Sequence, residues 1–144
     1  YKRQSYFIVE IKSLKRILDE SKKPEPLLCI IDEVLRGTNT IERIAASSRI
    51  LAALHQNWVI PFAATHDIEL SYILEDLYDN YHFEEEVKEK EVVFSYILKK
   101  GRATSRNAIR LLDMLEYDLG IVEGAAKAAR DFEEKGVWES LKPV

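Results

Sequence analysis

The spacing of apolar and polar positions along the chain predicts a mixed α/β fold. Two short apolar runs without alternation, Pro26–Ile31 and Trp58–Thr65, are typical of strands buried on both faces of a parallel sheet. Elsewhere apolar residues recur at intervals of three and four, which is the spacing of one helical face. The helices predicted in this way cover residues 7–18, 41–55 and 119–134.

A different pattern, alternation with period two, occupies the middle of the chain. Residues 78–87 and 91–98 alternate on either side of a short charged turn, which predicts an antiparallel hairpin. The basic segment 99–106 then leads into a predicted helix over 107–115. The N-terminus of that helix could meet an anion, or it is an ordinary capped helix with solvated charges. The expected fold class is α/β, a mainly parallel sheet with an antiparallel hairpin and flanking helices.

The order strand, helix, strand brings polar residues from distant parts of the sequence to one sheet edge. Such a connection is a right-handed parallel crossover, so both strands end on the same edge of the sheet. Asp32 and Glu33 directly follow the first strand, and His66 follows the second. We therefore expect His66 to lie near the two acids. Pro61 is unfavourable inside a central strand and indicates a bulge, whereas Gly37 is expected to permit a turn that other residues resist.

Length and composition narrow the classes of protein that remain. The 144 residues suit one domain, and 47% hydrophobic content is ordinary for a globular protein. A net charge of −4 gives no general attraction to nucleic acid or to anionic lipid. The single cysteine, Cys29, fits a reducing compartment, and we expect a cytoplasmic protein. No apolar run reaches the ~20 residues of a membrane span, and the start at Tyr1 suggests a fragment.

The acidic pair has the form of a Walker B element, in which two carboxylates end a buried strand. Asp32 would help to hold Mg²⁺ beside nucleotide phosphates, and Glu33 would polarise or position the attacking water. His66 could touch the γ-phosphate. The alternatives are a core strand that runs into an acid-rich turn, and a histidine that caps a helix or lies on the surface. None of the five glycines begins a Gly-x-x-x-x-Gly-Lys-Ser/Thr phosphate loop.

Four motifs together resemble the ATPase domain of the MutS family of DNA mismatch-repair proteins. They are Ser-Tyr-Phe-Ile-Val-Glu over 5–10, Ile-Asp-Glu-Val-Leu-Arg-Gly-Thr-Asn-Thr over 31–40, Ala-Thr-His-Asp-Ile-Glu-Leu over 64–70 and Tyr-Ile-Leu-Lys-Lys-Gly over 96–101. The resemblance extends from Ser5 to about Arg130. It implies a truncated P-loop NTPase domain of the ABC type that lacks its phosphate loop.

The resemblance also implies ATP and Mg²⁺ as cofactors and a homodimer that holds two nucleotides between its subunits. Ser5, otherwise a candidate helix N-cap, would contact the nucleotide held by the partner subunit. The loop after the acidic pair would line the dimer interface and report the state of the nucleotide. Contact with DNA would come through upstream domains. The residues implied are Glu33 and His66 for catalysis, Asp32 for the metal, and Ser5, Asp32, Arg36, Gly37, Thr38 and Asn39 for the nucleotide.

Departures from the family pattern leave other interpretations open. Ile41-Glu42-Arg43 replaces the usual Tyr-Asp-Gly, and Tyr6 replaces the signature threonine. The segment Leu35–Arg43 resembles more closely the divergent MutS-related ATPases. One alternative is a non-catalytic dimerisation or interaction module that keeps the ATPase scaffold. Another is a related ATPase of recombination or chromosome maintenance, which would carry long heptad coiled coils that this chain lacks. We expect the chain alone to be inactive, and to expose an edge or an apolar patch that invites self-association.

Overall fold

The computed structural model describes residues 6–88, 91–103 and 107–141. The chain divides into two compact units, one of residues 1–81 with 100–102 and one of residues 82–99 with 103–144. Its elements in chain order are α1 (Tyr6–Ser21), β1 (Leu27–Asp32), α2 (Thr40–Ala53), β2 (Val59–Ala64), α3 (Ile68–Ile73), β3 (Tyr81–Lys88), β4 (Glu91–Lys100), α4 (Ala108–Met114) and α5 (Leu119–Lys135).

The first unit is built on the parallel pair of β1 and β2, as the crossover predicted. Their register pairs Leu27 with Val59 at one end and Asp32 with Ala64 at the other, without a break. Pro61 sits opposite Cys29 within this register. The expected bulge at Pro61 is therefore wrong. In the described part of the chain this sheet has two strands, so a proline can be accommodated on an edge.

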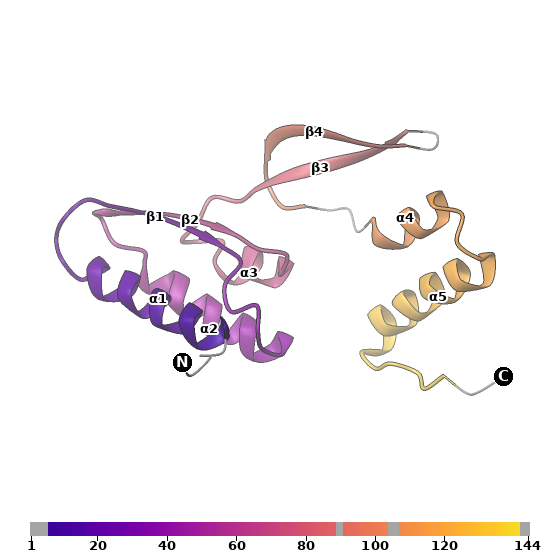
Figure 1. Ribbon diagram of the computed structural model, residues 1–144, viewed down its shortest axis with the longest axis horizontal. Coiled ribbons are helices and arrows are strands. Elements are labelled where there is room, and N and C mark those ends of the chain that lie inside the picture. Colours follow the sequence, from indigo (N-terminus) through magenta and orange to yellow (C-terminus); the bar gives the residue numbers. More distant parts are fainter. Residues whose placement is uncertain (1–5, 89–90, 104–106, 142–144) are drawn as a thin grey trace. The chain divides into compact units, whose positions relative to one another are not determined.

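Burial of the sheet is one-sided, and the prediction of strands buried on both faces is wrong. Helices α1 and α2 lie on the same side of β1 and β2 (Figure 1). Cys29 and Ile31 point to that side and are buried. The opposite face carries two cross-strand apolar pairs, and their side chains are 60–75% exposed because no described element covers them. This apolar sheet face consists of Leu28 with Ile60 and Ile30 with Phe62.

A hydrophobic core fills the space between the sheet and the helices of the first unit. Leu54 is fully buried at the end of α2, and burial of a side chain of this size stabilises the fold by about 1.5–3 kcal/mol. The indole N–H of Trp58 donates to the carbonyl of Ser21 at 2.9 Å and ties the start of β2 to the end of α1. The core residues are Leu14, Cys29, Ile31, Val34, Leu35, Leu51, Leu54, Val59, Leu70 and Leu74.

The starts of helices α2 and α3 are held differently. Asn39 caps α2, and its side chain accepts from the backbone N–H of Glu42 at 3.0 Å, at the spacing of a capping box. Helix α3 was not predicted, because its six residues are too few to show a helical repeat. It is held by an N-terminal turn at Asp67 and by the burial of Leu70.

The second unit contains the predicted hairpin and two helices. β3 and β4 pair as an antiparallel two-stranded sheet, and α4 and α5 follow. Asp118 caps α5 through the N–H of Gly120 at 2.9 Å, and Gly136 ends it with φ 70°. Among the described residues, no helix has both the length and the apolar character needed to cross a bilayer.

The basic segment before α4 is already engaged where it is described. Arg102 belongs to the first unit, where its guanidinium donates to the Ser71 carbonyl and the Glu75 carboxylate and lies 4.2 Å from the centre of the Tyr72 ring. Residues 104–106 lie outside the described part of the chain. Helix α4 spans seven residues and shows no side-chain cap. The possible anion site at its N-terminus stays a prediction.

Candidate functional site

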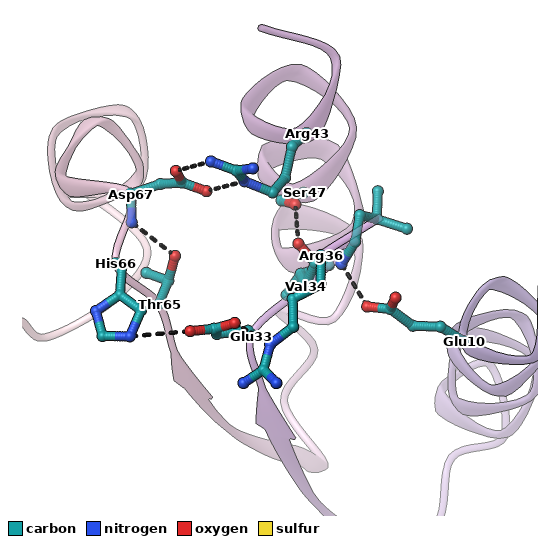
Figure 2. Close-up of polar contacts among 10 residues, drawn as sticks. Glu10, Glu33, Val34, Arg36, Arg43, Ser47, Thr65, His66 and Asp67 are labelled. Atoms are coloured by element: carbon teal, nitrogen blue, oxygen red, sulfur yellow. Dashed lines mark hydrogen bonds and ion pairs between the residues drawn. The ribbon is translucent and has the colours of Figure 1, made fainter. Parts of the chain in front are cut away.

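The carboxyl ends of β1 and β2 bring Glu33 and His66 into contact. Because Asp32 pairs with Ala64, the residues that follow both strands emerge at one edge. The backbone N–H of Glu33 extends the ladder and donates to the carbonyl of Ala64 at 2.9 Å. His66 Nε2 lies 2.9 Å from Glu33 Oε1, and Figure 2 shows the imidazole ring directed at the carboxylate. The juxtaposition expected from topology is present.

A second partner, Arg36, occupies the other oxygen of the Glu33 carboxylate. Its Nε donates to Oε2, and the adjacent carboxylate raises the pKa of the Arg36 guanidinium. Arg36 is itself exposed, so this ion pair is accessible to solvent and contributes little to stability. The carboxylate of Glu33 therefore lies between a guanidinium and an imidazole, and exchange of either partner for water or ligand costs little.

Asp32 differs from Glu33 in having a free carboxylate. It is exposed at the end of β1, and within the described residues its side chain makes no hydrogen bond. A hollow of about 320 Å³ opens beside it, between α1 and the end of β1. No cluster of three His, Cys, Asp or Glu side chains fit to hold a metal occurs within residues 6–88, 91–103 and 107–141. A cation bound at Asp32 would need its remaining oxygens from water or from a ligand. The hollow is lined by Tyr6, Glu10, Ser13, Leu14, Ile17, Ile30, Ile31, Asp32, Glu33 and Arg36.

The backbone that carries Glu33 is strained. Glu33 has φ 53° and Leu35 has φ 61°, in the left-handed region where non-glycine residues cost about 1–3 kcal/mol each. Two hydrogen bonds hold this loop from opposite sides. The N–H of Leu35 donates to Glu10 Oε1 at 2.5 Å, and Ser47 Oγ donates to the carbonyl of Val34 at 3.4 Å (Figure 2). Strained backbone held by its surroundings is typical of functional sites.

Glu10 contributes only one of its oxygens to this arrangement. Its Oε2 is buried and has no hydrogen-bond partner among the described residues. Glu10 belongs to the first motif of the sequence, yet its role as a tether for the strained loop was not predicted. The motif gave its identity, but not the residue to which it would bond.

The loop that follows, residues 36–39, makes its described side-chain hydrogen bonds to residues three or four positions away in the sequence. Thr38 Oγ1 donates to the Glu42 carboxylate at 3.0 Å, and Asn39 caps α2. Gly37 lies in a turn that a residue with a Cβ would resist, as predicted, although its φ is not positive. A Cβ at Gly37 would lie 2.9 Å from Phe7 Cδ2 and 3.1 Å from Phe7 Cβ. Glycine is needed there because α1 approaches the loop closely. Ser5 lies outside the described residues.

Sequence reasoning also missed an ion pair beside His66. Arg43 in α2 donates to Asp67 through Nε to Oδ2 at 2.7 Å and through Nη2 to Oδ1 at 2.6 Å. The guanidinium holds the pKa of the Asp67 carboxyl below its usual value. The N–H of Asp67 donates to Thr65 Oγ1 at 3.0 Å. In Figure 2 these contacts lie above the contact of His66 with Glu33.

These features define a mixed α/β domain with a carboxylate pair and a histidine at the carboxyl edge of parallel strands. The family model described as MutS domain V matches residues 1–133. The chain belongs to the MutS family, and the resemblance noted in its sequence is confirmed.

Curated relatives agree with this assignment. The chain is 33% identical over 141 residues to DNA mismatch repair protein MutS of Aquifex pyrophilus, covering 95% of this chain and 16% of the relative. It is 28% identical over 122 residues to MutS of Thermus thermophilus, with 85% and 15% covered. DNA mismatch repair protein MSH3 of Eremothecium gossypii is 33% identical over 132 residues, with 85% and 13% covered. The chain thus spans about one sixth or less of the length of these relatives.

Proposed function

We propose that this chain carries the hydrolytic edge of an ATPase that couples ATP binding and hydrolysis to DNA mismatch repair or a related DNA transaction. The observation that carries the proposal is the contact of Glu33 with His66, beside Asp32, at the shared edge of two parallel strands. Open α/β sheets bind their ligands beyond this edge. Membership of the MutS family, whose relatives are named as DNA mismatch repair proteins, supports the DNA transaction.

Asp32 is the residue that would hold Mg²⁺. Magnesium sites at nucleotides use one or two carboxylates and take the remaining oxygens from phosphates and water. One exposed carboxylate without a hydrogen bond fits that requirement. When bound, the ion would neutralise charge that develops on the phosphates. Its affinity would depend on the nucleotide, since no cluster of metal ligands surrounds Asp32 among the described residues.

Glu33 would orient the attacking water and accept its proton, and His66 would donate a hydrogen bond to the γ-phosphate. In the structure the two side chains contact one another, and Arg36 covers the remaining oxygen of Glu33. Both partners are exposed enough to exchange with water. On arrival of nucleotide, His66 would turn to the phosphate and leave one oxygen of Glu33 for the water.

The loop of Arg36, Gly37, Thr38 and Asn39, together with Ser5, would face the nucleotide held by a second subunit in a homodimer. Mostly exposed side chains on this loop are compatible with such an interface. DNA would be bound by other parts of the protein. The chain alone is expected to be inactive, because its sequence contains no phosphate loop to bind the nucleotide.

The decisive experiment measures ATP hydrolysis by the full-length protein and its Glu33→Gln and Asp32→Asn variants. Glu33→Gln should lower kcat by about 100-fold or more, because a general base typically contributes that much, while ATP binding persists. Asp32→Asn should weaken ATP binding in the presence of Mg²⁺. Glu25→Gln changes an exposed acid in the connection before β1 and is the matched control, expected to have no effect. Unchanged hydrolysis in Glu33→Gln would refute the proposal. Measurable ATP turnover by the isolated chain would refute the expectation that this chain is inactive alone.

A non-catalytic dimerisation or interaction module is the second candidate. The observation that favours it is that Arg36 and His66 together occupy both oxygens of Glu33. This alternative expects the parent protein to keep its cellular function after Asp32→Ala and Glu33→Ala. Loss of function in those variants, with dimerisation retained, would exclude it.

A further inference from the structure

The strongest ion pair of the candidate site lies one residue beyond His66. Arg43 and Asp67 meet through two parallel N–H···O bonds of 2.7 and 2.6 Å, and their side chains are only 24% and 12% exposed. The ion pairs of α1, such as Lys15–Asp19, are instead exposed to solvent. A bidentate guanidinium–carboxylate pair fixes orientation as well as distance. Asp67 is therefore held far more rigidly than an ordinary surface carboxylate.

His66, in contrast, has no packing of its own. Its side chain is 92% exposed, so no neighbouring side chain encloses the imidazole ring. Its place is set by the backbone turn between Thr65 and Asp67. That turn is closed by the N–H of Asp67 to Thr65 Oγ1, and it is anchored to α2 through Arg43. The position of the imidazole relative to Glu33 depends on that anchor.

The other end of the anchor leads to the loop after the acidic pair. Arg43 lies in the first turn of α2, and its N–H donates to the carbonyl of Asn39 at 2.9 Å. Asn39 is the last residue of the loop 36–39. A displacement of that loop would move the start of α2, and with it the guanidinium that holds Asp67. A contiguous chain of hydrogen bonds thus links the loop to the turn that carries His66. Figure 2 shows its part from Arg43 through Asp67 to Thr65.

We propose that Arg43 is a positioning residue that acts through Asp67 to hold His66 at the Glu33 carboxylate, and that it links this position to the loop 36–39. The inference rests on the proposed ATPase function. The hydrogen bonds to Asp67, together with the negative charge of Glu33 and Glu69, raise the pKa of the Arg43 guanidinium and keep it charged.

The test compares steady-state ATP hydrolysis by the full-length protein and its Arg43→Met, Arg43→Lys and Asp67→Asn variants. Arg43→Met keeps a long side chain but removes both hydrogen bonds, and kcat should fall about 10-fold or more, since small misplacements of reacting groups are costly. The KM for ATP should change by less than about 3-fold, because His66 is expected to act on the phosphate after binding. Arg43→Lys keeps the positive charge but cannot form two parallel hydrogen bonds to the carboxylate, so its kcat should lie between those of Arg43→Met and the wild type.

The decisive measurement repeats Arg43→Met in a His66→Ala background. If Arg43 acts through His66, the second substitution should lower kcat by less than about 2-fold more, because residues that act as a unit are not additive. Lys15→Met, which breaks the exposed pair on α1, is the matched control and should leave kcat unchanged.

Three results would overturn the inference. The first is that Arg43→Met and Asp67→Asn hydrolyse ATP as the wild type does. The second is that the losses of kcat from Arg43→Met and His66→Ala multiply in the double variant, which would indicate that the Arg43–Asp67 pair is purely structural. If Arg43→Met does not fold, full kcat in Arg43→Lys overturns it as well. A failure of the proposed function looks different, since the wild-type protein itself then shows no hydrolysis or none that Glu33→Gln abolishes.

Discussion

Glu33 and His66 are in contact at 2.9 Å although they follow different strands and a whole helix separates them in the sequence. The contact is a consequence of register. Asp32 and Ala64 are paired partners at the ends of β1 and β2, so the chain needs only one further residue on one side and two on the other to reach a common point. The site is therefore as precise as the pairing of the two strands beneath it.

His66→Ala should separate the role of the imidazole in hydrolysis from any role in folding. Because the ring is 92% exposed, the free energy of unfolding of the variant should lie within about 0.5 kcal/mol of the wild-type value. ATP hydrolysis by the full-length protein should fall by about 10-fold or more if the ring donates to the γ-phosphate. Thermal unfolding and steady-state kinetics test the two statements separately. His55→Ala, at an exposed histidine after α2, should change neither.

Gly37→Ala should destabilise the first unit. The new Cβ would meet two atoms of Phe7 within 3.1 Å, and overpacking of this kind costs about 1–3 kcal/mol. Gly124→Ala in α5 is the matched control, because nothing lies within 4 Å of its added Cβ and alanine favours a helix by about 0.5–1 kcal/mol. Urea unfolding followed by the fluorescence of Trp58, in a Trp138→Phe background, reports on the first unit. Equal stability of Gly37→Ala and wild type would contradict the close approach of α1.

Tyr78 makes the stability of the first unit dependent on alkaline pH. Its hydroxyl donates to the carbonyl of Leu51 at 2.7 Å, and burial raises the pKa of this phenol to about 12. Because the folded-state pKa lies above the ordinary value of 10, the neutral phenol stabilises the fold below pH 10. That contribution is lost as pH rises from 10 through about 12.

The measurement compares wild type with Tyr78→Phe. The unfolding free energy of the variant should be lower near neutral pH by about 0.5–1.5 kcal/mol and should fall less steeply above pH 10. The difference between their absorbance titrations should show the ionisation of Tyr78 alone among the seven tyrosines, at a pH above 10. A Tyr78 that ionises together with exposed Tyr117 would show that the hydroxyl is not buried.

The apolar sheet face should make the isolated chain self-associate. Leu28, Ile30, Ile60 and Phe62 form a contiguous patch, and exposed patches of this kind are typical of interaction surfaces. Phe62→Thr keeps the strand propensity and should lower the apparent molar mass in sedimentation experiments at high protein concentration. Leu141→Thr, at an exposed leucine outside regular structure, is the control. A monomer at all concentrations, with or without Phe62→Thr, would contradict the prediction.

Much of the first unit could be predicted, because its strands and helices show clear apolar patterns and their connection follows the right-handed crossover rule. The apolar runs before Asp32 and His66, the helix between them and the parallel crossover together determine which residues meet. One-sided burial could not be predicted, since Leu28 and Ile30 are as apolar as their buried neighbours Cys29 and Ile31. An apolar composition shows that a strand is compatible with burial on both faces. It does not show which of those faces another element covers.

The candidate site was predictable in part, for a related reason. Asp32, Glu33 and His66 follow from position along the strands, whereas Arg43–Asp67 and Glu10–Leu35 join distant segments and have no periodic signature. The reason for Gly37 was also beyond the sequence, because it depends on the place of Phe7 in the folded chain. The roles assigned to Asp32, Glu33, His66 and Ser5 remain predictions for the experiments above.

The burial of Cys29 gives the chain a built-in reporter of its own opening. This thiol is 5% exposed on the helix-covered side of β1, and burial raises its pKa, so a thiol reagent reacts with it only after the sheet separates from its helices. Because Cys29 is the only cysteine in the sequence, no other thiol competes for the reagent. Labelling rates, compared with those of an unfolded peptide, would yield the free energy of that local opening with no substitution at all.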